Sequence, residues 1–230
     1  MPLDFNPLNA VVNCGSAATL TDQEPLTISC WVKTTNPGSS NLGMFTCKQN
    51  TNGAAGRWSF RVGENVEVNS VAFEKNFSGA TMLRVSTANS IPLDTWTHVL
   101  ALWNGGSNAT AVQLYINGVE AVYANADSAN GSGTKTSDSL LPFCVGNNSA
   151  LGRDLVGFVS EVALWGSALL TIDQIKLLAS SRVKGMPLQI VPPTGGLRVY
   201  LPLDDFPLAA AGTGIGAARD RSSNGNHGTI

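Results

Sequence analysis

The sequence has few charged residues. They make up 13% of its 230 residues, and the formal net charge is -2, whereas globular domains usually have roughly 25% charged residues. The 14 Lys and Arg residues are scattered, with no run longer than two, and a nucleic-acid-binding surface needs a positive patch. We therefore predict no nucleic-acid partner. The Ser, Thr, Asn and Gly that dominate the polar positions suit hydrogen bonding to neutral ligands, or are ordinary loop composition.

Long apolar segments are also missing. No run approaches the ~20 residues that a transmembrane helix needs. The N-terminal residues Met1–Phe5 contain neither the basic region nor the apolar run of a signal peptide. The sequence therefore predicts no membrane insertion and no signal peptide, and synthesis in the cytoplasm.

Cysteine is scarce and shows no metal-type spacing. Of the four cysteines, Cys14, Cys30 and Cys144 lie in apolar, strand-like contexts. We predict reduced core residues. A disulfide between Cys14 and Cys30 across neighbouring strands is the alternative.

Alternating apolar and polar residues are what the chain does contain. The stretch 97–123 is typical of strand, loop, strand, two-residue turn and strand. Asn117 and Gly118 fix the turn, because both central positions of a type I′ turn need positive φ, which glycine adopts freely and asparagine tolerates. Leu114 and Ile116 share one face. This pattern predicts an antiparallel sheet with one buried side.

Other segments alternate in the same way. They are 26–33, 58–62, 81–85 and 197–201, each bounded by Gly, Asn or Pro. Many short strands at such spacing predict an all-β, two-sheet antiparallel sandwich. No composition shift marks a second domain, so residues 1–230 are predicted to form one domain.

One short amphipathic helix is predicted after residue 170. Thr171 and Gln174 form a capping box, in which each side chain bonds the backbone N–H of the other residue. An apolar stripe of Ile172, Ile175 and Leu178 follows. Gly185 and Pro187 end the helix.

Four motifs occur in order along the chain: Leu26-Thr-Ile-Ser-Cys-Trp-Val-Lys, Trp96-Thr-His-Val-Leu-Ala-Leu-Trp, Leu114-Tyr-Ile-Asn-Gly-Val and Gly157-Phe-Val-Ser-Glu-Val-Ala-Leu-Trp-Gly. Together they resemble the concanavalin A-like, laminin-G-like jelly-roll family. The resemblance covers residues 8–230. It implies a jelly-roll sandwich that recognises glycans or proteins through loops at one rim or through the concave sheet.

The C-terminal segment departs from the order of that family. Residues 197–205 and 220–229 resemble the strand and loop that come first in relatives. A sandwich whose termini lie side by side tolerates such a permuted order. The resemblance therefore implies that 197–230 supplies the strand usually found at the N-terminus and pairs with strands near it.

Ser160 is a second departure, because many relatives carry an aspartate there that contributes to a calcium site. Calcium takes six to eight oxygen ligands, and one group of residues is a candidate source of them. The group is Asp204, Asp205, Asp220, Asn224 and Asn226. The competing interpretation is that Asp220 and Asn224 cap turns.

No catalytic residues are predicted. Glucanases on this scaffold place paired carboxylates on one strand, and their Glu-x-Asp-x-x-Glu pattern is absent from this sequence. His98 lies in a predicted strand, which favours a structural role, and His227 has no identifiable partner. Neither a nucleophile elbow nor a nucleotide-binding loop occurs. The sequence therefore predicts that the protein is not an enzyme.

Sugar-binding residues are predicted in the loops 49–57 and 104–110, as parts of one rim. A sugar presents apolar C–H faces and hydroxyls, so its site needs an aromatic platform and hydrogen-bonding groups. Trp58 is the predicted platform, with core packing as the alternative. The predicted hydrogen-bonding residues are Asn50, Asn52, Arg57, Asn104 and Asn108.

The expected function is non-catalytic recognition or adhesion, with a glycan as ligand. A lectin-like domain without a leader peptide favours export by assembly, for example on the surface of a bacteriophage virion. The rival hypothesis is a decoration or assembly protein that binds neighbouring protein subunits and no sugar. A homo-oligomer or a particle assembly is compatible with both hypotheses.

Overall fold

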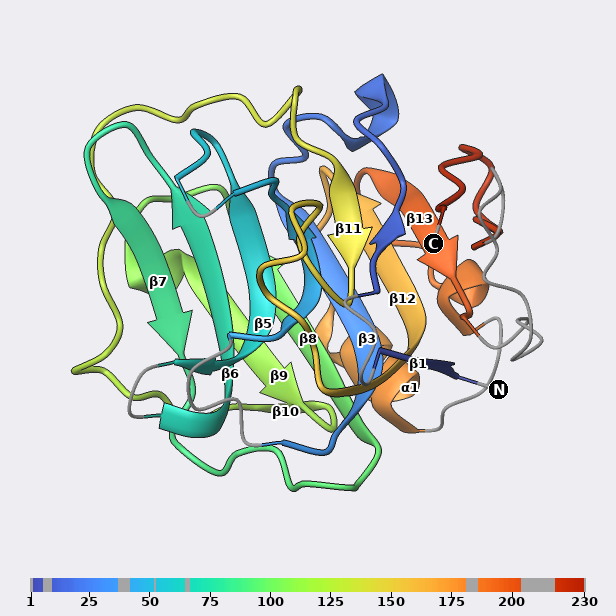
Figure 1. Cartoon of the computed structure of the whole chain (residues 1–230), viewed down its shortest axis with the longest axis horizontal. Coiled ribbons are helices and arrows are strands. Elements are labelled where there is room, and N and C mark those ends of the chain that lie inside the picture. The colour runs from blue at the N-terminus through green and yellow to red at the C-terminus, as the bar shows by residue number, and fades with distance from the viewer. Residues whose placement is uncertain are drawn as a thin grey trace.

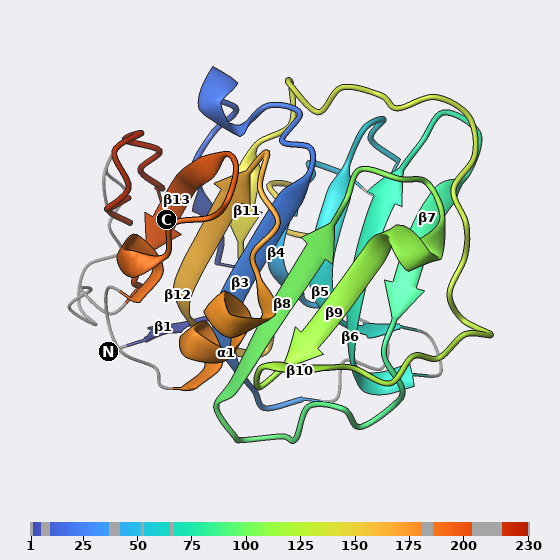
Figure 2. The same ribbon diagram turned by 180° about the vertical axis from the view of Figure 1, so that it is seen from behind.

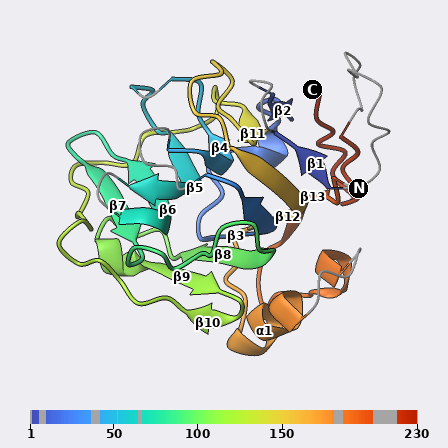
Figure 3. The same ribbon diagram turned by 60° about the horizontal axis from the view of Figure 1, so that its bottom comes forward.

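The computed structural model describes residues 2–5, 10–36, 42–51, 53–64, 67–180, 186–203 and 218–229. Its strands form two antiparallel sheets, of seven and six strands, that pack face to face (Figure 1). Figure 3 shows the two sheets as separate layers, with the helix outside the seven-stranded one. The predicted all-β jelly-roll sandwich is confirmed.

The sheets are ordered as follows. The seven-stranded sheet runs β1 (Leu3–Asp4), β12 (Gly157–Gly166), β3 (Leu26–Thr34), β8 (Thr97–Trp103), β9 (Val112–Ile116) and β10 (Val119–Glu120), and β13 (Gly196–Leu201) also pairs with β12. The six-stranded sheet runs β2 (Val12–Asn13), β11 (Phe143–Val145), β4 (Met44–Lys48), β5 (Trp58–Glu64), β6 (Glu67–Asn76) and β7 (Thr81–Val85).

The main core lies between the sheets. Every second residue of β3 points into it, namely Leu26, Ile28, Cys30 and Val32. From the other sheet, β5 contributes its own alternate residues. Because the side-chain period of a strand is two, the neighbouring positions face outward. The alternation in the sequence therefore decides which residues can form a surface site.

A second, smaller core lies on the outer face of the seven-stranded sheet. Helix α1 (Ile172–Ser180) packs there through Ile175 and Leu178, and Figure 2 shows it lying over this sheet. The predicted capping box is present, because Thr171 N donates to Gln174 Oε1 at 2.9 Å and Gln174 N donates to Thr171 Oγ1 at 3.4 Å. Ile172, which the stripe predicted as buried, is 45% exposed. The 3₁₀ turn η3 (Met186–Gln189) follows. The predicted helix stop at Gly185 lies outside the described residues.

Turns and loops join the strands at both ends of the sandwich. Asn117 and Gly118 have φ of 49° and 79°, as the predicted type I′ turn requires. The 3₁₀ turns η1 (Ala18–Leu20) and η2 (Ala109–Ala111) lie in two other connections. The segment 131–138 is held to the sandwich by Lys48, whose buried Nζ lies 2.8 Å from Asp138 Oδ1.

The C-terminal segment lies beside the N-terminus (Figure 1). Strands β1 and β13 pair with the same edge of β12, at Phe158–Val159 and at Val162–Gly166 respectively. Thr229 forms a bridge with Asn13 of β2. The expected pairing with N-terminal strands is therefore seen at Thr229, whereas β13 pairs with β12. The permuted order relative to relatives stays a prediction.

All four cysteines are buried free thiols. Cys47 and Cys144 face each other on β4 and β11, and burial, followed by its contact with Cys144, raises the pKa of the Cys47 thiol well above its ordinary value. Ser160, at the second departure from the family pattern, donates its hydroxyl to the Pro202 carbonyl at 3.1 Å. None of the helices in the described ranges has the length and apolarity needed to span a membrane.

Candidate functional site

A pocket rich in arginine opens on the outer face of the six-stranded sheet. Its floor is formed by β4, β5 and β6, and its wall includes the loop between β11 and β12. Its cavity volume is about 40 Å³, and the empty space is about 230 Å³ when the open solvent at its mouth is included. We call it the arginine pocket. Its lining residues are Leu42, Met44, Gln49, Arg57, Ser59, Arg61, Glu74 and Arg153.

Strand alternation puts the polar side chains on this face. In β5, Trp58, Phe60 and Val62 point into the core, so Ser59 and Arg61 point outward. The register with β6 places Glu74 opposite Ser59 and the small Ala72 opposite Arg61. The polar side chains on this outer face therefore come from two neighbouring strands, β5 and β6.

Glu74 joins two of the arginines. Its Oε1 pairs with Arg57 Nη1, and its Oε2 lies 3.0 Å from Arg61 Nη2. Arg61 also donates through Nη1 to the Gly63 carbonyl at 2.6 Å. Burial alone would raise the pKa of Glu74, but the guanidiniums of Arg61 and Arg57 hold it below its ordinary value. Glu74 is therefore an ionised carboxylate at neutral pH.

Arg57 Nε and Ser59 Oγ are buried polar atoms of lining residues and have no hydrogen-bond partner among the described residues. Ser59 is only 1% exposed. A buried donor or acceptor without a partner costs roughly 1–3 kcal/mol, so native proteins rarely keep one without a reason. Both residues line the pocket, so a water molecule or a small polar group of a ligand that reached these atoms would satisfy them.

The structure brings only one of the predicted sugar-binding residues into the arginine pocket. Arg57 lines it, whereas Asn50, Asn104 and Asn108 are exposed and do not. Asn52 lies outside the described residues. The loops 49–57 and 104–110 both border the segment 131–138. In the loop 49–57, Gly56 has a φ of 75° and lies so close to this segment that an added Cβ would be 2.3 Å from the Ser137 carbonyl oxygen. In the loop 104–110, the Ser107 carbonyl accepts a hydrogen bond from Gly131 N at 2.8 Å.

Trp58 lies in the core and is 2% exposed. Its ring is stacked with Phe73 at a centroid distance of 6.1 Å and lies at the same distance from Phe143. A sugar ring cannot reach the indole in this arrangement. The structure therefore supports the core alternative for Trp58, because β5 begins at this residue and its first side chain points inward.

Sequence reasoning missed most of the pocket. Ser59 and Arg61 carried a usable signal, since they are the outward positions of a segment recognised as alternating. Glu74 needs the β5–β6 register, which no local pattern supplies. Arg153 comes from a distant loop and had no signal.

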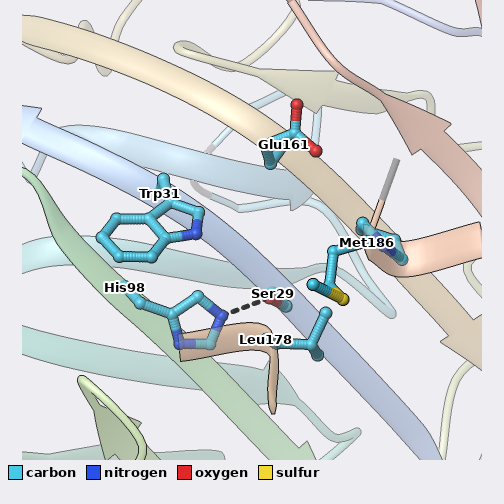
Figure 4. Close-up of a pocket in the computed structure, with 7 residues that line it drawn as sticks. Ser29, Trp31, His98, Glu161, Leu178 and Met186 are labelled. Atoms are coloured by element: carbon cyan, nitrogen blue, oxygen red, sulfur yellow. Dashed lines mark hydrogen bonds between the residues drawn. The ribbon is translucent and has the colours of Figure 1, made fainter. Parts of the chain in front are cut away.

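A second pocket lies on the other sheet, beside α1 and η3 (Figure 4). It has about 200 Å³ of empty space. His98 Nε2 lies 2.8 Å from Ser29 Oγ, and burial lowers the pKa of His98 to about 3, so the imidazole is neutral. Glu161 points away from His98 in Figure 4, and its Oε2 accepts from the Tyr200 hydroxyl at 2.7 Å. The Ser29–His98 pair therefore has no orienting carboxylate from Glu161, which fits the structural role predicted for His98.

The candidate calcium ligands are engaged with the protein. Asp220 Oδ1 accepts from Tyr200 N at 2.9 Å and from Ser222 N at 2.8 Å, and Oδ2 accepts from Asn226 N at 2.8 Å. Asn224 Nδ2 donates to the Leu197 carbonyl at 2.8 Å. This arrangement fits the alternative of turn capping, and the calcium prediction stays untested.

The remaining candidates, Asp204 and Asp205, lie outside the described residues, so their part in the calcium prediction stays untested. Within the ranges that the structure describes, no three His, Cys, Asp or Glu side chains gather in a way that would hold a metal ion.

Several solved structures share this fold. A Bacteroides ovatus protein described as carbohydrate-binding is 16% identical to this chain. The match has a TM-score of 0.56 and covers 95% of this chain and 55% of the Bacteroides ovatus chain. The NanB sialidase of Streptococcus pneumoniae is 12% identical, with a TM-score of 0.52 over 76% of this chain and 26% of its own. A tailspike protein of an Escherichia coli O157:H7 bacteriophage is 14% identical, with a TM-score of 0.50 over 85% of this chain and 25% of its own.

These likenesses concern the fold alone. This chain spans about half the length of the first of those proteins and about a quarter of the other two. No curated protein matches the sequence. The family model of the concanavalin A-like lectin/glucanases superfamily matches residues 9–176. Since that match covers most of the chain and the two-sheet sandwich agrees with it, the protein belongs to the concanavalin A-like lectin/glucanases superfamily.

Proposed function

We propose that this protein is a non-catalytic module that binds glycans, and that the arginine pocket is its binding site. The observation that carries the proposal is the pair of buried polar atoms without a partner, Arg57 Nε and Ser59 Oγ, in residues that line a solvent-open pocket. Sugar hydroxyls both donate and accept hydrogen bonds, so one sugar unit can satisfy both atoms. Leu42, which is half-buried in the lining, offers apolar surface to its C–H groups.

The chemistry of the pocket supports binding without catalysis. Glycoside hydrolysis needs two carboxyl groups across the scissile bond, one of them protonated. Glu74 is the one carboxylate among the lining residues, and two arginines hold it in its ionised form. It is therefore unsuited to act as a general acid at neutral pH.

A single substitution tests the proposal. We expect the wild-type protein to bind at least one glycan on a glycan array and to release no new reducing ends from it. Ser59→Ala should bind that glycan about 3–10-fold more weakly, as the loss of one hydrogen bond predicts. Its melting temperature should be unchanged or higher, because a buried hydroxyl without a partner is removed.

Ser139→Ala is the matched control, since Ser139 is exposed and lies outside the pocket. It should bind as the wild type does. A blank array, or wild-type affinity in Ser59→Ala, would reject the arginine pocket as a glycan site. Release of reducing ends would reject the non-catalytic part of the proposal.

The biological setting that we propose is adhesion from the surface of a bacteriophage particle. The tailspike protein with the same fold supports this setting only at the level of architecture. The rival function is the binding of neighbouring protein subunits without any sugar.

A further inference from the structure

We infer that the arginine pocket selects an acidic sugar, one that carries a carboxylate. The inference rests on the proposed function and adds the chemical class of the ligand. It concerns the charge of the pocket, whereas the proposed function rests on its unpartnered polar atoms.

The lining residues carry an excess of positive charge. Arg57, Arg61 and Arg153 contribute three guanidiniums, and Glu74 contributes the one carboxylate of the set. Such clustering is notable in a chain with 13% charged residues and 14 Lys and Arg in all. A neutral glycan needs no such excess, whereas an anionic ligand would be attracted by it.

Burial makes this charge effective. The Arg61 side chain is 2% exposed and that of Arg57 is 14% exposed. Charges that are shielded from water interact more strongly and are screened less by salt than exposed ones. Glu74 pairs with both of these guanidiniums, and Arg153, half-buried on the β11–β12 loop, is the third guanidinium of the lining.

The donors suit a planar oxyanion. A guanidinium presents five N–H donors in a rigid plane that matches a carboxylate. Glu74 already occupies Arg57 Nη1 and Arg61 Nη2, while Arg57 Nε has no partner among the described residues and Ser59 Oγ lies in the same lining. A ligand carboxylate placed there would accept from both groups.

The size of the pocket limits what enters. Its cavity volume of about 40 Å³ is far below the roughly 300–1,000 Å³ typical of sites for drug-sized molecules. It has room for the carboxylate of one sugar unit, while the rest of a longer chain stays outside. The ligand would then be a polysaccharide that places the carboxylate of a single acidic unit in the pocket.

The test compares acidic polysaccharides with their own neutral forms. Polygalacturonate, alginate, hyaluronan and polysialic acid are immobilised, each beside its carboxyl-reduced counterpart, and dextran sulfate is added as a sulfate source. We expect the protein to bind at least one carboxylated polysaccharide. It should bind the carboxyl-reduced counterpart of that polysaccharide at least 10-fold more weakly, and it should also bind dextran sulfate more weakly.

Two variants of equal charge change localise the effect. Arg153→Gln should lose at least 10-fold affinity for the carboxylated member, whereas Arg219→Gln, at an exposed position outside the pocket lining, should bind as the wild type does. A loss of similar size in both variants would indicate non-specific charge attraction and overturn the inference, as would tighter binding to dextran sulfate.

Failure of the acidic-sugar inference and failure of the proposed function give different results. Equal binding of the acidic and reduced forms, with loss in Ser59→Ala, would overturn the acidic class and leave the proposed function standing. Binding of neither form, together with a blank glycan array, would overturn both.

Discussion

Trp58 and Ser59 are neighbours in the chain with opposite roles. The indole fills the core beside Phe73 and Phe143, while the hydroxyl lies in the arginine pocket. Because successive strand residues face opposite sides of a sheet, this one peptide unit connects the packing that stabilises the sandwich to the surface that we propose for binding. Substitutions at the two positions should therefore differ in kind.

At Trp58 we expect a large loss of stability. Truncation of a buried aromatic side chain removes its burial energy and leaves a cavity, which together cost about 3–5 kcal/mol. Trp58→Ala should therefore lower the free energy of unfolding by that amount in a denaturant titration. Trp58→Phe, which keeps an aromatic ring, should cost clearly less. A loss below about 1 kcal/mol in Trp58→Ala would contradict the core position.

Strand β12 is the element on which the C-terminal part depends. It pairs with β3 along one edge and with β1 and β13 along the other. Strand β13 adds the buried side chains Val199 and Leu201 to the main core. The C-terminal segment is thus part of the folded sandwich, as the alternating pattern of 197–201 predicted.

Truncation before Gly195 should therefore damage the whole sandwich. The edge of β12 between Val162 and Gly166 would lose its backbone partners, and apolar core positions would be exposed. We expect the truncated chain to aggregate on purification, as seen by size-exclusion chromatography. A chain that ends at Thr229, which keeps the bridge to Asn13, is the control. A soluble product with an unchanged melting temperature would contradict a structural role for β13.

At the scale of the molecule, the two outer faces of the sandwich differ. The face of the seven-stranded sheet carries α1, as Figure 2 shows, and the second core lies beneath that helix. The face of the six-stranded sheet carries the arginine pocket, with a wall from the β11–β12 loop. A sandwich with a helix on one outer face and a pocket on the other can attach to an assembly away from the pocket and still present the pocket to a ligand.

The proposed setting of adhesion from a particle leads to a prediction about location. In a lysate of the cells that produce the protein, we expect it to sediment with a particle or ring assembly and, in that fraction, to retain the glycan identified on the array. The Ser59→Ala variant should sediment in the same way but retain less glycan, because the substitution changes only the pocket. Sedimentation with a particle, combined with a blank array, would favour the rival structural function.

Much of the fold was predictable because it depends on local rules. The alternation of Leu26, Ile28, Cys30 and Val32 determined one face of β3, and the capping box at Thr171 determined where α1 begins. The positive φ of Asn117 and Gly118 follows from turn chemistry. Each of these features depends on residues a few positions apart, so the sequence by itself specifies them.

The candidate site was decided by tertiary structure. Arg57 was recognised from its loop, but its partner Glu74 is set by the register of β5 and β6, and Arg153 reaches the same pocket from the connection between β11 and β12. The burial of Trp58 depends on which way the first residue of β5 points. The sequence determined the sandwich because side-chain period and turn geometry act locally. Only the folded chain decided the arginine pocket, because charges that are far apart in sequence become neighbours when strands pair and a loop packs beside them.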